Sequence, residues 1–201
     1  MKIGPKYKLA RRLGAPIFEK TQGPKYALSL SKKEKNDQMP TRPKSEFGKQ
    51  LIEKQKARFS YGVTEKQFAK YVKKSLHAPE PTQKLFQALE SRLDNVLYRS
   101  GFAKTRLQAR QMASHGHTTV NGGRVTVPSI ELREGDVVSV REGSQKSALF
   151  LGVDERLKQA PVPAWLTVNP EKAESKVMGK PVYEKSASVF DLGAVIEFYS
   201  R

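Results

Sequence analysis

The 201-residue sequence contains no cysteine. Disulfides, thiolate zinc sites, iron–sulfur clusters and thiol catalysis are therefore excluded. Of its three histidines, His115 and His117 form a His-x-His pair, but no third histidine or carboxylate cluster is near enough in sequence to complete a metal site. No apolar run approaches the roughly 20 residues that a membrane helix needs, and none follows the basic N-terminus as in a secretory signal. We expect no metal, no cofactor and no membrane partner.

Positive charge, in contrast, is abundant. There are 37 Lys and Arg against 20 Asp and Glu, a formal net charge of +17. Residues 1–60 hold 16 basic and 5 acidic residues, and residues 91–130 hold six basic residues and one acid, Asp94. A field of this sign attracts polyanions, so nucleic acid is the first partner to consider.

Residues 1–45 are rich in Lys, Pro and Gly and have few periodic apolar positions, which predicts an extended basic arm. A solubilising tail is the plainer alternative. Beyond it, apolar residues at helical spacing predict helices over 45–59 and 64–75. Cations and an aromatic ring surround the first helix and suit phosphate contacts and stacking on RNA, although an ordinary solvated helix face would look similar. They are Lys49, Lys54, Lys56, Arg58 and Tyr61.

Two short helices are predicted over 92–100 and 106–115. Ser91 with Asp94, and Thr105 with Gln108, fit the capping-box pattern, in which a hydroxyl and a residue three positions on satisfy free backbone N–H groups. Gly101 and Gly116 are suitable C-terminal stops. At 100° per residue the second helix has one packing arc, Ala109, Met112 and Ala113, and an adjacent arc with Arg106, Arg110 and Ser114.

A small sheet is predicted next. Residues 117–120 and 124–127 read as two strands joined by Asn121-Gly122, a strong hairpin turn because both positions tolerate positive φ. A further strand is expected over 136–140. Trp165 lies with Leu166 and Val168 on a probable strand and is expected in the core, with a stacking platform as the alternative. Two helices and a small sheet form a platform suited to recognising the shape of folded RNA, and too small for a catalytic pocket. The fold class is α+β.

The motifs of this segment resemble the S-four RNA-binding domain. They are Arg92-Leu-Asp-Asn-Val-Leu-Tyr-Arg99, Gly101-Phe102, Thr105-Arg106, Gln108-Ala-Arg-Gln111, Ser114-His-Gly116 and Val120-Asn-Gly122. The flanks, notably Gly4-Pro-Lys-Tyr-Lys-Leu9, Tyr61-Gly62 and Ile196-Glu-Phe-Tyr-Ser-Arg201, are similar to the S-four family of small-subunit ribosomal proteins of the bacterial or organellar type, here in a cysteine-free form.

The resemblance implies three parts. Residues 1–45 would be the basic arm, and residues 46–90 a mostly helical rRNA-binding domain completed by 180–201. Residues 91–179 would be the inserted S-four domain, two short helices packed on a small, mainly antiparallel sheet, with its extension.

The resemblance also implies a function. The chain would be a structural, non-enzymatic constituent of the small ribosomal subunit that binds the five-prime domain of small-subunit rRNA and nucleates assembly. It would contribute to the channel through which mRNA enters and to translational accuracy, with ribosomal protein S-five and mRNA as further partners. It would not be a homo-oligomer, and it would reside on ribosomes of the cytoplasm or of an organelle.

Candidate RNA-binding residues lie in both domains. In the helical domain they are Lys49, Lys54, Lys56, Arg58 and Tyr61, and in the S-four domain Arg92, Asn95, Arg99, Arg106, Arg110, Gln111, Ser114, His115, Asn121, Gly122 and Arg124. His115 would donate to phosphate, and a plain surface histidine is an equal alternative. Arg42, Lys44 and Lys49 are candidate residues of the mRNA channel, although the segment 20–45 lacks the zinc-binding cysteines of many relatives.

Two other functions stay open. Arg-Leu-Asp also occurs in pseudouridine synthases, where such an aspartate is the nucleophile, so an RNA-modifying enzyme is the main rival. The third position of a helix that starts at Ser91 instead favours a capping role for Asp94, and no separate catalytic domain is present. A stress-type S-four protein acting on stalled ribosomes would bind large-subunit particles.

Overall fold

The computed structural model describes residues 3–34 and 45–200. The chain divides into two compact units, Met1–Leu85 with Tyr183–Arg201, and Phe86–Val182. The first unit is helical and the second combines helices with a five-stranded antiparallel sheet. The predicted α+β class is confirmed.

The N-terminal segment is folded, so the prediction of an extended arm is wrong for its described part. It forms α1 (Lys6–Leu13), the 3-10 turn η1 (Glu19–Thr21) and α2 (Pro24–Glu34). A small core of buried residues holds these elements together, with Ile52 and Phe59 of the next helix packed against it. Its members are Ala10, Leu13, Ala15, Ile17, Phe18 and Tyr26. Sparse and small apolar residues suffice because a neighbouring helix completes their burial.

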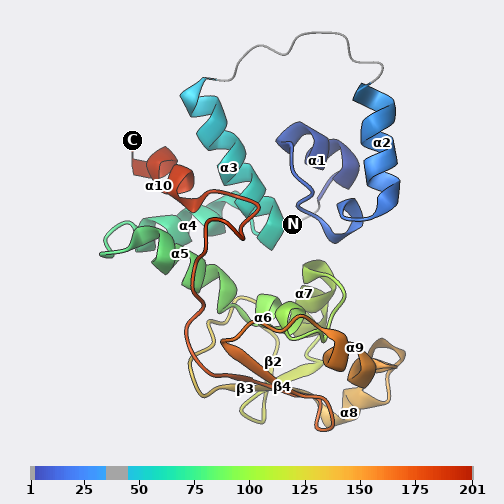
Figure 1. Ribbon diagram of the computed structural model, residues 1–201. Helices are drawn as coiled ribbons and strands as arrows, with labels where there is room; N and C mark the ends of the chain where they lie inside the picture. The colour runs from blue at the N-terminus through green and yellow to red at the C-terminus, as the bar shows by residue number, and fades with distance from the viewer. Residues whose placement is uncertain (1–2, 35–44, 201) are drawn as a thin grey trace. The chain divides into compact units, whose positions relative to one another are not determined.

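Three further helices lie wholly within the first unit: α3 (Glu46–Tyr61), α4 (Glu65–Ser75) and α10 (Leu192–Ser200). The side chains of Ser45 and Thr64 cap α3 and α4 by accepting hydrogen bonds from backbone N–H groups three residues on. The two helices predicted here are confirmed. Although α10 is far from α3 in sequence, it packs along α3 and also contacts α4 (Figure 1).

The second unit begins within α5 (Pro81–Glu90), which contains the boundary between the units, and continues with α6 (Leu93–Arg99) and α7 (Arg106–Ser114). Both short helices match their predictions to within a residue at each end. Gly101 and Gly116 follow them with φ of +89° and +71°, as their predicted role as helix stops requires.

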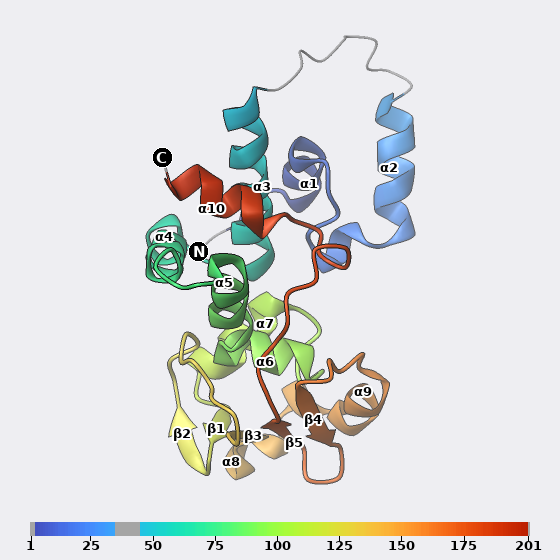
Figure 2. The ribbon, with the colours of Figure 1, turned by 60° about the vertical axis from the view of Figure 1, so that its left-hand side comes forward.

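A single antiparallel sheet has the strand order β2-β1-β3-β5-β4. Its strands are β1 (Thr118–Val120), β2 (Gly123–Val125), β3 (Val137–Val140), β4 (Leu166–Asn169) and β5 (Glu174–Val177). The predicted hairpin is confirmed: Val120 pairs with Gly123, and Asn121 and Gly122 have φ of +50° and +80°. The connection from β3 to β4 contains α8 (Glu142–Gln145), the 3-10 turn η2 (Ala148–Phe150) and α9 (Val153–Gln159). Helices α6 and α7 lie over the sheet in both ribbon views (Figure 2).

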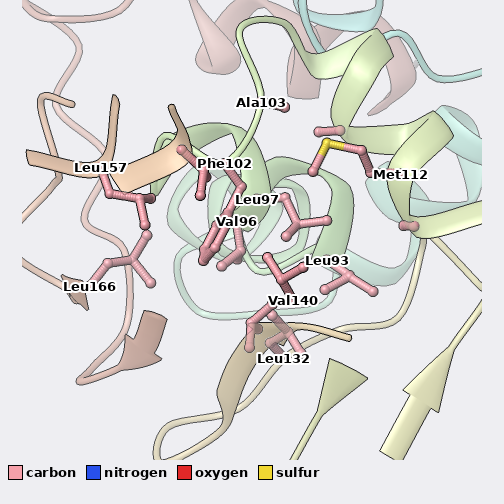
Figure 3. Packing of buried hydrophobic residues seen from close by; sticks show 14 of the residues in the cluster. Leu93, Val96, Leu97, Phe102, Ala103, Met112, Leu132, Val140, Leu157 and Leu166 are labelled. Atoms are coloured by element: carbon pink, nitrogen blue, oxygen red, sulfur yellow. The ribbon is translucent and has the colours of Figure 1, made fainter. Parts of the chain in front are cut away.

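The core of the second unit lies between these helices and the sheet (Figure 3). Leu93 and Leu97 of α6 and Met112 of α7 meet Val138 and Val140 of β3, with Phe102 from the link between the helices. Trp165 precedes β4 and packs half-buried against this cluster, so it contacts the core without being one of its buried members. This packing fixes α6 and α7 to the sheet and determines which of their faces reach solvent. Among the described helices, none is long and apolar enough to cross a membrane.

Candidate RNA-binding surface

Helix α7 is the centre of the candidate surface. Thr105 caps it by accepting a hydrogen bond from the Gln108 N–H at 3.1 Å, and the Gln108 side chain accepts one from the Lys104 N–H at 2.9 Å. Ala109, Met112 and Ala113 are buried. The opposite face is therefore presented to solvent, and it carries Leu107, Gln111, Ser114 and His115, all exposed.

Asp94 lies in the first turn of α6 and is bound by two arginines. Its carboxylate accepts from Arg92 Nε at 3.0 Å and Nη2 at 2.9 Å. Arg110, from α7, donates to Asp94 Oδ2 through Nε at 2.8 Å and Nη2 at 2.6 Å. The side chain of Asp94 is only 3% exposed, so these contacts replace its hydration.

The predicted capping box at Ser91 is wrong. Arg92 occupies the N-cap position of α6 without a side-chain capping bond, and the Ser91 N–H still bonds to Gln87 O at the end of α5. Asp94 is held by arginines, and its first-turn position complements the helix dipole as expected. The interpretation that Asp94 is structural stands on different bonds from those we predicted.

Glu90, the last residue of α5, is a second buried carboxylate, and the sequence analysis missed it. Arg99 donates to it in a fork, Nε to Oε2 and Nη2 to Oε1, both at 2.9 Å. Asn95 Nδ2 also donates to Oε2 at 2.9 Å. Glu90 lies one residue outside the segment in which six basic residues accompany a single acid. Its spacing from Asp94 gives no signal, because Glu90 ends α5 and Asp94 belongs to α6.

Arg106 links these groups to α7. Its Nε donates to Asn95 Oδ1 at 2.8 Å, its guanidinium lies 4.5 Å from the centre of the Tyr98 ring, and Nη2 is 3.9 Å from Glu90 Oε1. We call the set Glu90, Arg92, Asp94, Asn95, Arg99, Arg106 and Arg110 the arginine–carboxylate network. Four guanidiniums face two carboxylates, so the network retains positive charge.

Two candidate contact residues of this network need correction. Arg92 and Asn95 are 2% and 1% exposed, and both spend their polar atoms on buried partners, so they are internal supports rather than surface contacts. The side chains of Arg99, Arg106 and Arg110 are 36%, 18% and 22% exposed. They are the members of the network that can meet a partner directly.

The β1–β2 hairpin forms the part of the candidate surface that lies next to the C-terminus of α7. Arg124 is exposed, and its guanidinium lies so close over Gly116 that a Cβ at this glycine would overlap it. Asn121, also exposed, donates to Asp136 Oδ1 at 2.8 Å and accepts from the Val137 N–H at 2.9 Å. These bonds fix the exposed turn, including Gly122, to the start of β3.

The candidates of the first unit are less accessible than predicted. Tyr61 is 2% exposed and Lys54 7%, so both are corrected to internal positions. Lys56 and Arg58 are half-buried and paired with Glu53 and Glu65. Lys49 is exposed and pairs with Glu46 at 3.2 Å. Arg42 and Lys44 lie outside the described residues.

One cationic face of the first unit was not predicted. The buried residues Phe68, Val72 and Ser75 mark one side of α4. Exposed lysines occupy the other side, because positions three, four and seven residues apart share a helix face. They are Lys66, Lys70, Lys73 and Lys74.

No cluster of three or more potential metal ligands occurs within residues 3–34 and 45–200. His115 and His117 stack with ring centroids 6.0 Å apart, and His117 Nδ1 lies 3.0 Å from the Ser144 hydroxyl. The pair is therefore used in packing and hydrogen bonding. The exposed member, His115, stays a candidate for contact with phosphate.

Comparison with known families gives two matches. The ribosomal protein S4/S9 N-terminal domain matches residues 1–91, and the S4 domain matches residues 91–138. The small ribosomal subunit protein uS4 of Roseiflexus castenholzii is 40% identical over 202 residues, which cover 99% of this chain and 98% of the relative.

Two other relatives have the same name. The uS4 protein of Polaromonas naphthalenivorans is 41% identical over 208 residues, covering 99% of this chain and 98% of its own. That of Corynebacterium kroppenstedtii is 47% identical over 158 residues, covering 78% and 79%. Since identity near 40% extends over almost the whole of both chains, this chain belongs to the uS4 family of small ribosomal subunit proteins.

Proposed function

We propose that the chain binds the five-prime domain of small-subunit ribosomal RNA through the exposed face of α7 and the β1–β2 hairpin. The observation that carries this proposal is the distribution of cations along α7. Lys104 is exposed where the helix begins, Arg124 is exposed beside Gly116 where it ends, and the partly exposed Arg106 and Arg110 lie between. At 1.5 Å per residue this row covers about 18 Å, enough to follow several phosphates.

The surface has the chemistry of backbone recognition. Gln111, Ser114 and Asn121 are exposed among the cations and can donate to or accept from phosphate and 2′-hydroxyl groups. Folded RNA is recognised mainly through these groups and through its shape. The exposed lysines of α4 supply a second cationic face in the first unit.

The uS4 family is structural and non-enzymatic, so the expectation that the chain is not an enzyme is confirmed. The pseudouridine synthase alternative is therefore dropped. Asp94, which that alternative would use as nucleophile, is occupied by Arg92 and Arg110.

Within the ribosome, we propose that the chain is a primary binding protein that nucleates small-subunit assembly and contributes to the mRNA channel and to translational accuracy. Its further partners would be ribosomal protein S-five and mRNA, and it would act as a single copy in the ribosomes of the cytoplasm or of an organelle. The family membership and the net charge of +17 support these proposals.

The test uses the double variant Lys104→Ala with Arg124→Ala. The salt dependence of Kd would be measured with a transcript of the five-prime domain. Each lost phosphate contact should reduce the slope of log Kd against log[KCl] by about one unit, so we expect weaker binding and a slope lower by about two. These residues are preferable to Arg106 and Arg110, because the latter are bonded to buried carboxylates and their removal would also disturb the fold.

The matched control is Arg141→Ala with Lys146→Ala, which removes two exposed charges of the same unit around α8. This control should change the slope much less. Equal effects of the two double variants would contradict the assignment of the α7 surface. A chemical footprint on large-subunit rather than small-subunit RNA would contradict the proposed partner.

A further inference from the structure

We propose that Glu90 and Asp94 are positioning residues: they hold Arg99, Arg106 and Arg110 in fixed orientations, and so supply selectivity among RNAs rather than strength of binding. The inference rests on the proposed RNA-binding function. It concerns acids, which repel phosphate and would not be sought in an RNA-binding surface. Their contribution follows from burial, geometry and charge.

Burial separates the acids from the cations they hold. The side chains of Glu90 and Asp94 are 1% and 3% exposed, so neither carboxylate faces an incoming RNA. The guanidiniums of Arg99, Arg106 and Arg110 lie over them and remain partly exposed. The negative charge is underneath and the positive charge is at the surface.

The geometry fixes direction as well as place. Arg99 binds both oxygens of Glu90 through two parallel hydrogen bonds of 2.9 Å, whereas Nε and Nη2 of Arg110 both donate to Asp94 Oδ2. Two donors on one carboxylate orient a guanidinium, which one contact to a flexible lysine cannot do. Each pair of bonds therefore restricts where the other side of its arginine points.

Arg106 is fixed by other means to the same effect. Asn95 accepts from its Nε, and the Tyr98 ring lies against its guanidinium. Asn95 is itself anchored by donating to both the backbone O and the side chain of Glu90, at 3.0 and 2.9 Å. Glu90 thus orients Arg99 directly and Arg106 through Asn95.

The charge balance argues against a role in affinity alone. If the arginines served only to raise the positive field, two buried carboxylates among them would cancel half of their charge. Attraction to phosphate is independent of sequence and depends on the number of cations, whereas recognition of a particular RNA depends on oriented donors. The two carboxylates thus weaken the positive field of the arginines and fix the orientation of their N–H donors.

The test compares Glu90→Gln and Asp94→Asn with wild type on two transcripts: the five-prime domain of small-subunit rRNA and an unrelated folded RNA of equal length. Both substitutions keep the shape of the side chain and remove its charge. We expect the Kd for the five-prime domain to rise about tenfold, the scale of one oriented arginine contact. The Kd for the unrelated RNA should stay constant or fall, because the protein becomes more positive.

Glu134→Gln is the charge-matched control, since Glu134 is exposed in the same unit. This variant raises the net charge by the same amount without touching the network. It should leave unchanged the selectivity ratio, which is the Kd for the unrelated RNA divided by the Kd for the five-prime domain. If Glu90→Gln fails to give a cooperative melting transition, Arg99→Lys takes its place. This variant keeps both charges but loses the fork, and we again expect a lower ratio with an unchanged salt slope.

Three outcomes would overturn the inference. An unchanged ratio in the folded network variants would leave the acids with a role in folding only. Equal strengthening for both RNAs with a steeper slope in the Glu90→Gln and Asp94→Asn variants would mean that the arginines act as bulk charge. A lower ratio in Glu134→Gln would assign the effect to net charge. The proposed function fails separately, if wild type itself does not prefer the five-prime domain.

Discussion

Lys54 lies almost buried in the first unit, with its ammonium 2.8 Å from the Glu65 carboxylate. The same ammonium lies over the rings of Phe198 and Tyr199, 4.7 and 5.7 Å from their centroids. The Tyr199 hydroxyl donates to Glu65 at 2.7 Å. One charge pair therefore connects α3, α4 and α10. The lysine, predicted to contact RNA, instead anchors the C-terminal helix.

Replacing Glu65 with Gln should destabilise the first unit, because the nearly buried ammonium of Lys54 would lose its counter-charge. Glu65 is half-exposed, so we expect a loss of about 1–2 kcal/mol in the free energy of unfolding rather than the larger cost of a fully buried pair. Urea denaturation followed by circular dichroism measures it. Glu46→Gln, which breaks an exposed pair with Lys49, is the control and should cost less than about 0.5 kcal/mol.

The same pair predicts how stability changes in acid. Burial by itself would raise the pKa of Glu65, but hydrogen bonds from Lys54 and Tyr199 and the charges of Lys54 and Arg58 outweigh it and lower the pKa below its ordinary 4.5. A lowered carboxylate pKa gives stability that is present above the ordinary pKa and is lost as the pH falls through the folded-state value.

We therefore expect the free energy of unfolding to be level above pH 5 and to decline below about pH 4.5. Glu65→Gln should show a shallower decline, measured by urea denaturation at pH 7 and pH 4. Asp191 also contributes to the wild-type decline: burial opposes ionisation, but bonds from Lys185 and the Gly193 N–H prevail and lower its pKa too. Identical pH profiles for wild type and variant would contradict the assignment to Glu65.

Gly116→Ala should lower both stability and RNA affinity. The residue has φ of +71°, and an added Cβ would overlap the Arg124 guanidinium. The backbone strain alone costs about 1 kcal/mol, and Arg124 must move away. Gly122→Ala isolates the strain, because that glycine has φ of +80° with nothing within 4 Å of the added Cβ. Thermal unfolding should show a similar strain cost in both, and only Gly116→Ala should displace Arg124 and weaken RNA binding beyond it.

Thr105→Ala should cost about 1 kcal/mol, because its hydroxyl oxygen accepts the Gln108 N–H at the start of α7. Ser91→Ala should cost much less, since Ser91 is not the N-cap of α6. Chemical denaturation of both variants decides between the sequence pattern and the structure. A larger loss for Ser91→Ala would show that the capping box at α6 forms after all.

Substitutions at Asn121 can separate its two contributions to the hairpin. Asn121→Gly keeps the backbone conformation at φ +50° but loses the side-chain bonds to Asp136 and Val137. Asn121→Ala loses the same bonds and also strains the backbone at this φ. We expect about 1 kcal/mol for the lost bonds and about 1 kcal/mol more for the alanine. Amide hydrogen exchange of β1 and β2 measures the local effect, and equal exchange in the two variants would exclude backbone strain.

Local features were predictable from the sequence. The α7 cap at Thr105, the glycine stops and the Asn121-Gly122 turn depend on residues within four positions of one another, and all appear in the structure. The helices α1 and α2 were missed because their few apolar residues become a core only when Ile52 and Phe59 of α3 cover them. Strand β5 was missed as well, because Val177 is the one apolar residue among its four; it lies between β4, its hairpin partner, and β3, which is 35 or more residues away in sequence.

The candidate surface was predictable in type but not in detail. A count of charges indicated that arginines gather between residues 92 and 124, and the structure places them around α6 and α7. It could not show that Arg92 would be buried, because that depends on the carboxylate of Asp94 and on the chain from Pro128 to Leu132 passing beside α6. Whether a side chain is buried or exposed depends on tertiary packing, which the spacing of residues in the sequence does not reveal.

The interrupted layout of the first unit has a consequence for synthesis. Gln50 of α3 donates to Glu197 of α10 across 147 positions of sequence, and the second unit occupies the chain between them. Since a nascent chain emerges from its N-terminus and domains fold as units, residues 86–182 can complete their core while α3 still waits for α10. The unit whose residues appear first is thus the last to be finished, and during that interval the faces of α3 and α4 that α10 later covers are exposed.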